Sequence, residues 1–435
     1  MNHAQLHRLV VDALRRQPVT DLHTHCYAPR FGASPKPGGL LLWGIDELVT
    51  YHYLIAEVYR VVPPSGQRDA NRRDPHVLPY PRFWKMSKRQ QADHIWKHLF
   101  VNRTPVSEAC RGVLTTLQRL GLDPNESTLE PYRRWFAQQK PDAYVDKVMA
   151  LANLDQITMT NPVFDDHERR MWLDDPMVGR DPRFRAVLRI DPLLRDWPGA
   201  CAKLQAWGFD ARPDFSGRTV EQVRRFLKSW IKRMRAAYVA MSLPPAFRFP
   251  DPDHPEADRF LAECLMPVCA DQGLPWALMI GSRLRVNPAL RDAGDTVGKA
   301  DVMSVVNLCD RFDDNKFLVT MLSRENQHEL CVTARKFSNL MVFGCWWFLN
   351  NPSIVEEITR ERLELLGTSF VPQHSDARIL DQLIYKWDHT RCILARVLTD
   401  KYADLATTGF RVTARHIQRD TALLLRDNYR DFLAR

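Results

Sequence analysis

The sequence lacks any apolar run that could cross a membrane. A transmembrane helix needs about 20 consecutive apolar residues, and no stretch of the 435 residues approaches that length. Residues 1–17 form a polar, amphipathic segment instead of a charged start followed by an apolar run, so no secretory signal is predicted. We therefore expect a cytoplasmic protein with no membrane partner.

Paired cysteines are also missing. The nine cysteines stand singly, without a CxxC spacing, and most of them lie inside apolar runs such as LAECLMPVCA. This usage is typical of a reducing compartment, where cysteine serves as a small core residue. It excludes a disulfide framework and gives no indication of a structural zinc knuckle.

No block of one charge sign stands out, although the formal net charge is +9. Lys and Arg alternate with Asp and Glu along the chain, and no basic aromatic motif is present. We therefore predict no nucleic-acid partner. A mildly cationic surface instead favours small anionic substrates. The 12 Trp and 20 Phe provide ample apolar volume for one large core.

Eight short apolar runs recur along the chain, each bounded by turn residues and followed by a longer segment of helical character. Continuous apolar runs are typical of strands that are buried on both faces of a parallel sheet. The runs are 18–23, 154–160, 185–190, 237–242, 275–281, 316–322, 339–345 and 368–373.

Helical patterns separate these runs, for example at 219–236, 302–312, 325–337 and 353–367, where Ser353 is the expected helix cap. Eight alternating strand and helix units predict an α/β fold, a distorted (β/α)8 TIM-like barrel that forms a single domain over 1–435. The long interval between the first two strands has helical patterns, so 26–150 is predicted as a large helical insertion in this domain.

The first predicted strand ends in Asp-Leu-His23-Thr-His25. Residues two apart on a strand point the same way, so both imidazoles should project from the carboxyl end of the barrel. Asp376 follows the eighth run, which lies beside the first in a closed barrel. His23, His25 and Asp376 therefore predict a divalent metal site, with Zn favoured and Mn or Fe as alternatives. The other interpretation of Asp376 is a cap of the following helix.

Several further segments occur in the order found in the uronate isomerases of the amidohydrolase superfamily, and the chain resembles that family along nearly its whole length. GIDELVTYHYLIAEVYR resembles the family helix that carries a His-Tyr pair, here His52 and Tyr53. The other matching segments are LRID, FGCWWF, FVPQHSDAR and KWDHTRCIL. Two departures are Met279, where the family has a histidine on the fifth strand, and Asn161 in a T-D-D-P-like segment.

The resemblance implies an intramolecular oxidoreductase, an aldose-ketose isomerase acting on a hexuronate through a cis-enediol. Asp376 would bind the metal and shuttle a hydroxyl proton, while His52 and Tyr53 would transfer the other protons. The substrate-binding residues would be Arg189, Arg378, Arg391 and Trp347.

An arginine fork suits the carboxylate of a sugar acid, although each of these arginines could instead form an ordinary ion pair at the barrel rim. We thus expect a small anionic sugar-acid substrate and a homo-oligomer. The alternative functions are a metal-dependent hydrolase of an amide, ester or lactone, and a non-catalytic binding protein. Against the hydrolase, no histidine follows the fifth or sixth run, where such hydrolases commonly have ligands.

Overall fold

A parallel sheet forms the centre of the molecule in the computed structural model, which describes residues 2–64 and 77–435. Within these residues the sheet has seven strands in the order β1-β2-β3-β4-β5-β8-β9, and all neighbouring pairs are parallel. The strands are β1 (Val19–Thr24), β2 (Leu154–Pro162), β3 (Phe184–Arg189), β4 (Val239–Leu243), β5 (Trp276–Ile280), β8 (Phe317–Met321) and β9 (Leu340–Val342). Seven of the eight predicted strands are therefore confirmed.

The eighth predicted strand, 368–373, is reduced to a single bridge between Val371 and Phe343. The segment still closes the barrel through main-chain hydrogen bonds. On one side the Val371 amide donates to Val342 at 3.1 Å, and on the other the Asp376 amide donates to the His23 carbonyl at 3.1 Å. Proline at 372 has no amide hydrogen, which limits ladder formation here. The fold is thus a distorted TIM-like barrel, as predicted.

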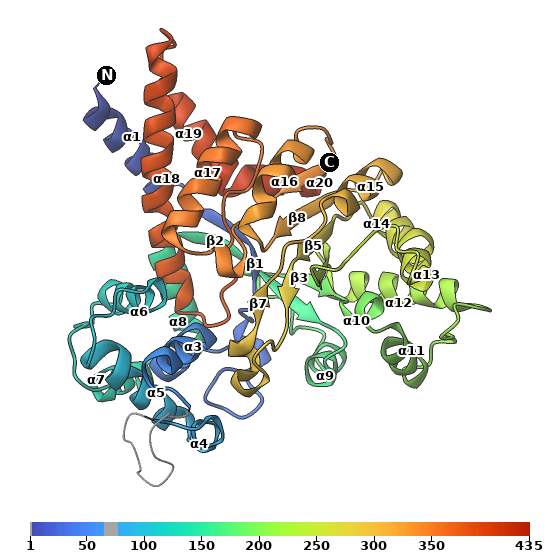
Figure 1. The fold of residues 1–435 in the computed structure, drawn as a ribbon, viewed down its shortest axis with the longest axis horizontal. Helices are drawn as coiled ribbons and strands as arrows, with labels where there is room; N and C mark the ends of the chain where they lie inside the picture. The colour runs from blue at the N-terminus through green and yellow to red at the C-terminus, as the bar shows by residue number, and fades with distance from the viewer. Residues whose placement is uncertain (1, 65–76) are drawn as a thin grey trace.

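Helices surround the sheet and follow its strands in sequence (Figure 1). Those after β2 are α9 (Asp166–Asp174), α10 (Pro192–Arg195), α11 (Trp197–Ala206), α12 (Thr219–Met234), α13 (Pro255–Arg259), η3 (Phe260–Leu265), α14 (Met266–Gln272), α15 (Met303–Arg311), η5 (Arg324–Asn326), α16 (Gln327–Ala334), η6 (Trp347–Leu349) and α17 (Pro352–Leu366). Asn351 caps α17, accepting a hydrogen bond from the Ile354 amide at 3.3 Å. Ser353 already lies inside this helix, so its predicted capping role is wrong.

The N-terminal helix packs against α18 and α19 of the C-terminal segment on one side of the barrel. The amphipathic N-terminal helix α1 (His3–Arg16) lies along α18 (Gln382–Thr407), the longest helix in Figure 1. The helices α19 (Ala414–Ala422), η7 (Leu423–Asp427) and α20 (Asn428–Ala434) complete the chain. Buried Leu6, Val10 and Leu14 form the apolar face of α1, so its sequence pattern directly determines this packing.

Helices joined by loops make up the described part of the interval between β1 and β2. It contains η1 (Pro29–Phe31), α2 (Ile45–Val49), α3 (His52–Val61), α4 (Tyr80–Lys85), α5 (Lys88–Trp96), η2 (Lys97–Val101), α6 (Glu108–Arg119), α7 (Glu130–Ala137) and α8 (Pro141–Ala152). Most of these helices gather at one end of the molecule, at the lower left of Figure 1. That 26–150 is an insertion within a single domain stays a prediction.

A small antiparallel hairpin, absent from the sequence prediction, follows β5. It pairs β6 (Ser282–Arg283) with β7 (Thr296–Val297) and encloses η4 (Pro288–Gly294). Figure 1 shows this segment beside α3, in agreement with the contacts between α3 and η4. The hairpin thus lies over the carboxyl end of the barrel, where sites form in this fold.

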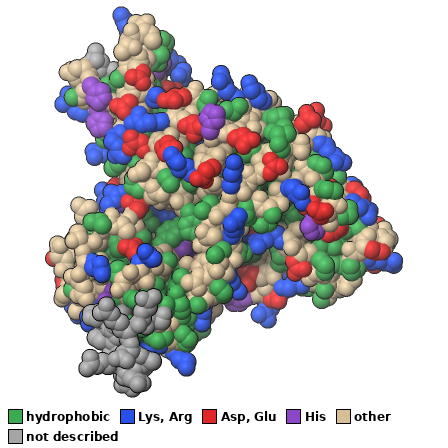
Figure 2. Space-filling model, in the orientation of Figure 1, with side chains coloured by type: hydrophobic (Ala, Val, Ile, Leu, Met, Phe, Trp, Pro, Cys, Tyr) green, Lys and Arg blue, Asp and Glu red, His purple; other side chains and the backbone are tan. Residues whose placement is uncertain are grey.

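Acidic and basic side chains are interspersed over the face of the molecule seen in Figure 2. Within the two described segments, no helix is long and apolar enough to span a lipid bilayer.

Candidate active site

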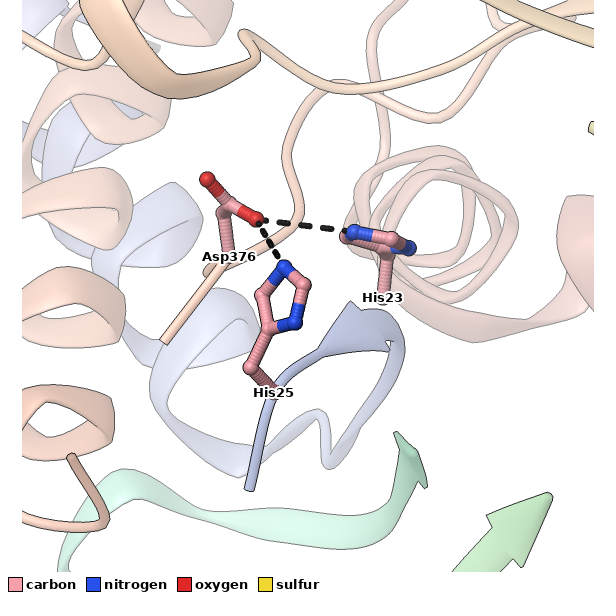
Figure 3. Close-up of side chains that lie close together, drawn as sticks. All are labelled: His23, His25 and Asp376. Atoms are coloured by element: carbon pink, nitrogen blue, oxygen red, sulfur yellow. Dashed lines mark ion pairs between the residues drawn. The ribbon is translucent and has the colours of Figure 1, made fainter. Parts of the chain in front are cut away.

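His23 and His25, at the end of β1, converge with Asp376 (Figure 3). Nε2 of His23 lies 3.5 Å from Oδ1 of Asp376, and Nε2 of His25 lies 3.4 Å from the same oxygen. Two ligand atoms about 2.1 Å from a tetrahedral ion would be about 3.4 Å apart. The predicted metal ligands therefore come together with separations that one shared cation can bridge.

The position of Asp376 depends on an unusual backbone conformation. Its φ is 49°, in the left-handed region that non-glycine residues rarely adopt. Hydrogen bonds on both sides hold this conformation, from the Asp376 amide to His23 and from the His25 amide to Ala377 at 2.7 Å. Strain of this kind persists where surrounding structure enforces it, often at a functional site.

The donor set fits a metal ion. Oδ1 of Asp376 is buried and has no hydrogen-bond partner within the described residues, although a carboxylate oxygen in that position requires one. Burial alone would raise the pKa of Asp376, but the imidazoles of His23 and His25 outweigh it and hold that pKa well below its ordinary value. Burial lowers the pKa of His25 to about 4. The carboxylate is thus ionised and the His25 imidazole neutral, as ligation requires.

A buried polar layer beneath Asp376 fixes its loop. The carboxylate of Asp21 accepts hydrogen bonds from the Ser375 amide at 3.2 Å and from Nε1 of Trp387 at 2.9 Å. The ammonium of Lys386 donates to the Ser375 carbonyl. Helix α18 therefore orients the loop that carries the acidic ligand, and Asp21 joins it to β1.

Two further contacts orient the His23 imidazole. Oγ1 of Thr160, on β2, lies 3.2 Å from Nδ1 of His23, which leaves Nε2 facing Asp376. The ring of His374 packs edge-on against that of His23 at 5.3 Å. A Cβ atom on Gly344 would lie 1.7 Å from Nδ1 of His374, so only glycine is accommodated there.

The cluster opens into a cavity of about 190 Å³. Polar side chains from several strand ends and from the hairpin line it, as expected at the carboxyl end of a barrel. Its walls are His23, His25, Tyr51, His52, Arg189, Arg195, Ser242, Ser282, Leu284, Asp292, Asp295, Trp346, Trp347, Asp376 and Arg378.

His52 and Trp347 form one wall as a bonded pair. Nε1 of Trp347 donates to Nε2 of His52 at 3.1 Å, and Trp347 has a left-handed φ of 50°. Burial, followed by the nearby Arg378 charge, lowers the pKa of His52 to about 3. The Tyr53 hydroxyl donates to the Trp347 carbonyl at 3.1 Å, and Tyr53 is not among the lining residues, whereas Tyr51 is.

Two of the three predicted carboxylate-binding arginines reach this cavity. Nε of Arg189 donates to Asp191 at 2.6 Å and its Nη2 to Ser242 at 2.9 Å, which fixes the guanidinium. Arg378 reaches the rim and approaches Asp292 at 3.5 Å.

Arg391 does not reach the cavity, and its predicted substrate role is wrong. Its guanidinium donates to the main-chain carbonyls of Leu14, Ala152 and Asn153 at 3.2, 2.7 and 3.1 Å. These carbonyls end α1 and α8, where the last turn of a helix lacks intrahelical donors. Arg391 therefore stabilises two helix ends.

Sequence reasoning missed several lining residues, among them Tyr51, Ser242, Asp292 and Asp295. Ser242 could have been found, because it ends a predicted strand run and so belongs at the catalytic end of the barrel. Asp292 and Asp295 lie in a hairpin that has no strong strand pattern, and no sequence signal distinguishes them.

The comparison with known structures decides the family. A uronate isomerase from Bacillus halodurans C-125 is 50% identical over 100% of this chain and 97% of its own, with a TM-score of 0.92. The chain belongs to the uronate isomerase family. Two more distant structures share the fold. A uronate isomerase from Thermotoga maritima is 14% identical over 99% of this chain and 97% of its own, with a TM-score of 0.73. A glucuronate isomerase from Caulobacter crescentus is 15% identical over 99% of this chain and 94% of its own, with a TM-score of 0.75.

The uronate isomerase fold also resembles a putative metal-dependent hydrolase from Lactobacillus casei, at 11% identity over 98% of this chain and 97% of the other, with a TM-score of 0.55. No protein-family model and no curated protein matches the chain. Met279 lies buried on β5 at the position where the uronate isomerase family was expected to have a histidine.

Proposed function

We propose that this chain interconverts the aldose and ketose forms of a hexuronate, either D-glucuronate and D-fructuronate or D-galacturonate and D-tagaturonate. The observation that carries the proposal is the His23, His25 and Asp376 cluster in a small cavity shared with two arginines, in a chain of the uronate isomerase family. The substrate class fits the cavity, because an open-chain uronate combines hydroxyl groups with one terminal carboxylate.

Aldose-ketose isomerisation requires a polarised carbonyl, a base for the proton on the adjacent carbon, and a donor that returns a proton to the neighbouring carbon. His23, His25 and Asp376 would hold a divalent ion, with Zn favoured and Mn or Fe as alternatives, and this ion would act as a Lewis acid toward substrate oxygens. Asp376 is ionised and can accept and return a hydroxyl proton of the sugar.

His52 is the proposed proton-transfer group at the opposite wall. It is neutral at physiological pH, because its pKa lies at about 3. Its Nε2 accepts the Trp347 indole hydrogen, which orients the ring within the cavity. Tyr53 packs edge-on against His52 at 4.5 Å and is the predicted partner in this transfer. Together they would carry the proton between the two carbons of the cis-enediol.

Arg189 and Arg378 would bind the substrate carboxylate. The side chain of Arg189 is about one-fifth exposed, and its guanidinium is held by Asp191 and Ser242, so it would meet the substrate in a fixed orientation. Arg378 is more exposed and is paired only loosely with Asp292 at 3.5 Å. A planar donor fork matches a carboxylate better than an ammonium group does. A homo-oligomer and a cytoplasmic location stay predictions.

The direct test is to purify the chain, measure its bound metal, and assay a panel of hexuronates for ketose formation in D2O. We expect turnover with deuterium incorporated beside the new carbonyl, because the enediol exchanges its proton with solvent. A metal-loaded protein that is inert on every uronate but cleaves lactones or amides would support the hydrolase instead.

The two neighbouring tyrosines give a finer test. Tyr53→Phe removes a hydroxyl bonded to the Trp347 carbonyl, and Tyr51→Phe removes the hydroxyl of a lining residue. If Tyr53 transfers a proton, its substitution lowers kcat by about 10²-fold or more, whereas Tyr51→Phe has the smaller effect. If Tyr51→Phe lost more kcat than Tyr53→Phe, proton transfer would be assigned to Tyr51 instead.

A further inference from the structure

A second cavity of about 560 Å³ adjoins the first. The two share Tyr51, His52, Asp292 and Arg378, so they meet along one neck. Helices α2, α3, α4 and α5 form one wall of the second cavity and the η4 loop forms the other; we call this space the vestibule. Its lining includes Leu42, Glu47, Thr50, Ile55, Trp84, Lys88, Arg285, Pro288, Arg291, Ala293 and Ile379.

The vestibule has an excess of positive charge. Lys88 is neutralised by Glu47 at 2.8 Å, and Arg378 lies 3.5 Å from Asp292. Arg285 and Arg291 have no carboxylate within ion-pair distance in the described parts of the chain, and both are exposed. The carboxylate of Asp295 accepts the Arg285 amide hydrogen at 2.6 Å, but Asp295 lines the inner cavity and not the vestibule. Two guanidinium groups without an ion pair in the described residues therefore line a space that adjoins the predicted metal site.

The η4 loop that carries Arg291 is held against α4. Nε1 of Trp84 donates to the Ala289 carbonyl at 2.8 Å, and the guanidinium of Arg291 lies over the Trp84 ring at 4.3 Å from its centre. Arg291 has a φ of 54°, a costly conformation for a residue with a side chain. At the loop base, a Cβ atom on Gly294 would lie 1.9 Å from the Asn287 carbonyl oxygen, so glycine is required. The loop is thus built to keep this arginine in place.

We propose that the vestibule is an outer anion-binding subsite that captures the carboxylate of a sugar acid through Arg285 and Arg291 before the substrate passes the neck. This inference rests on the proposed function and adds a binding step to it. At the neck, an incoming carboxylate competes with Asp292 for Arg378. That exchange is feasible because the side chains of Arg378 and Asp292 are 44% and 63% exposed, and an exposed ion pair is weak.

The physical basis is the field of unpaired cations at the mouth of a cleft. Such a field raises the local concentration of an anionic substrate and depends steeply on ionic strength. The Debye length is about 30 Å at 0.01 M salt and about 3 Å at 1 M. Capture by the vestibule therefore predicts a salt-sensitive kcat/KM with a nearly salt-independent kcat.

The test compares kcat/KM in one variant that removes positive charges from the vestibule and in another that removes a negative charge. We expect Arg285→Gln/Arg291→Gln to lower kcat/KM for the hexuronate by about tenfold at low salt and to lose most of this effect at 1 M. Asp292→Asn removes the competing anion and should raise kcat/KM by about two- to threefold. The matched control is Arg411→Gln/Arg415→Gln, which removes the same net charge: both residues are exposed, at or just before α19, far from α4 in Figure 1, and their substitution should change nothing.

The vestibule is rejected if the double variant keeps the native kcat/KM at low salt, or if its loss persists unchanged at 1 M. A loss equal to that of Arg411→Gln/Arg415→Gln would likewise reject it, since a general effect of net charge would then be sufficient.

Equilibrium binding separates this proposal from the proposed function. D-glucarate is a six-carbon sugar diacid with no aldehyde, so its binding can be measured by calorimetry without turnover. Weaker glucarate binding by the double variant, together with an inactive native chain, would retain the vestibule and reject the isomerase. If the native chain turns over the hexuronate and the double variant binds glucarate as tightly as the native chain does, the isomerase is supported and the vestibule is rejected.

Discussion

Arg189 and Arg391 were predicted to share one role, but they lie at opposite ends of the barrel. Arg189 is the last residue of β3 and holds its guanidinium against Asp191 and Ser242, beside the cavity. Arg391 donates to carbonyls that directly precede β2. Both are charged residues in a family-like motif, so residue type and motif alone do not separate them.

The position along a strand separates them. In a (β/α)8 barrel, the carboxyl ends of the strands carry the chemistry and the amino ends contribute stability. Arg189 satisfies this rule and Arg391 does not, because α18 presents Arg391 to the ends of α1 and α8. Substitutions at the carboxyl end should therefore change activity, and those at the amino end should change the free energy of unfolding.

Asp376→Asn should have the largest effect. The substitution removes the charge and basicity of the proposed ligand with little change in volume, so we expect turnover to fall by about 10³-fold or more while the fold persists. Activity and circular dichroism would be measured together. Asp388→Asn is the control, since Asp388 lies on α18 and, within the described residues, forms its one ion pair with Arg119, at 3.7 Å. If Asp376→Asn turned over the substrate at the native rate, the proposed role of Asp376 would be rejected.

Arg189→Lys should have the next largest effect. It keeps the positive charge but loses the planar fork, so one charged hydrogen bond to the substrate is lost. At about 1.5–3 kcal/mol for such a bond, kcat/KM should fall by about one to two orders of magnitude. Steady-state kinetics would measure the change, and an unaltered KM and kcat would show that Arg189 does not contact the substrate.

Arg391→Gln should change stability and leave catalysis intact. The substitution leaves main-chain carbonyls at two helix ends without a donor, at a cost of about 1–3 kcal/mol in the free energy of unfolding. Urea unfolding would measure this cost beside kcat/KM. A large loss of kcat/KM without a loss of stability would restore the substrate role and break the comparison between the two barrel ends.

The smallest expected effect is on how the stability of the fold depends on pH. The pKa of His52 is about 3 in the folded chain, below the ordinary value of 6.5, because the ring is desolvated. Between these values the unfolded chain binds more protons than the folded one, so stability should fall as pH drops from about 6.5 toward 3. Melting temperatures of the native chain and His52→Gln would be compared at pH 7 and 5. The variant should lose less stability than the native chain over this range.

Much of the fold could be predicted because buried parallel strands require continuous apolar runs, and seven such runs became strands. The eighth predicted run, 368–373, does not form a strand because its segment must position Asp376. It leaves the ladder near Val371 and turns Asp376 into a left-handed conformation beside β1. Apolar composition predicts burial there but cannot predict a local break in pairing.

The convergence of the proposed metal ligands was predictable because strand periodicity places His23 and His25 on one side and barrel closure brings Asp376 beside them. The buried polar layer that holds the Asp376 loop could not be predicted. Asp21 stands in the same motif, yet its bonds to Ser375 and Trp387 depend on how α18 packs against the barrel. Side chains that act through such long-range packing leave no periodic signal in a sequence.

The bond between Asp21 and Ser375 joins positions 354 residues apart. During synthesis, the histidines therefore leave the ribosome long before their acidic counterpart is available. A nascent chain can hold only two of the three proposed ligands, so the proposed ion site is complete only after translation has passed Asp376. A chain truncated before Asp376 would therefore lack the carboxylate of the proposed site.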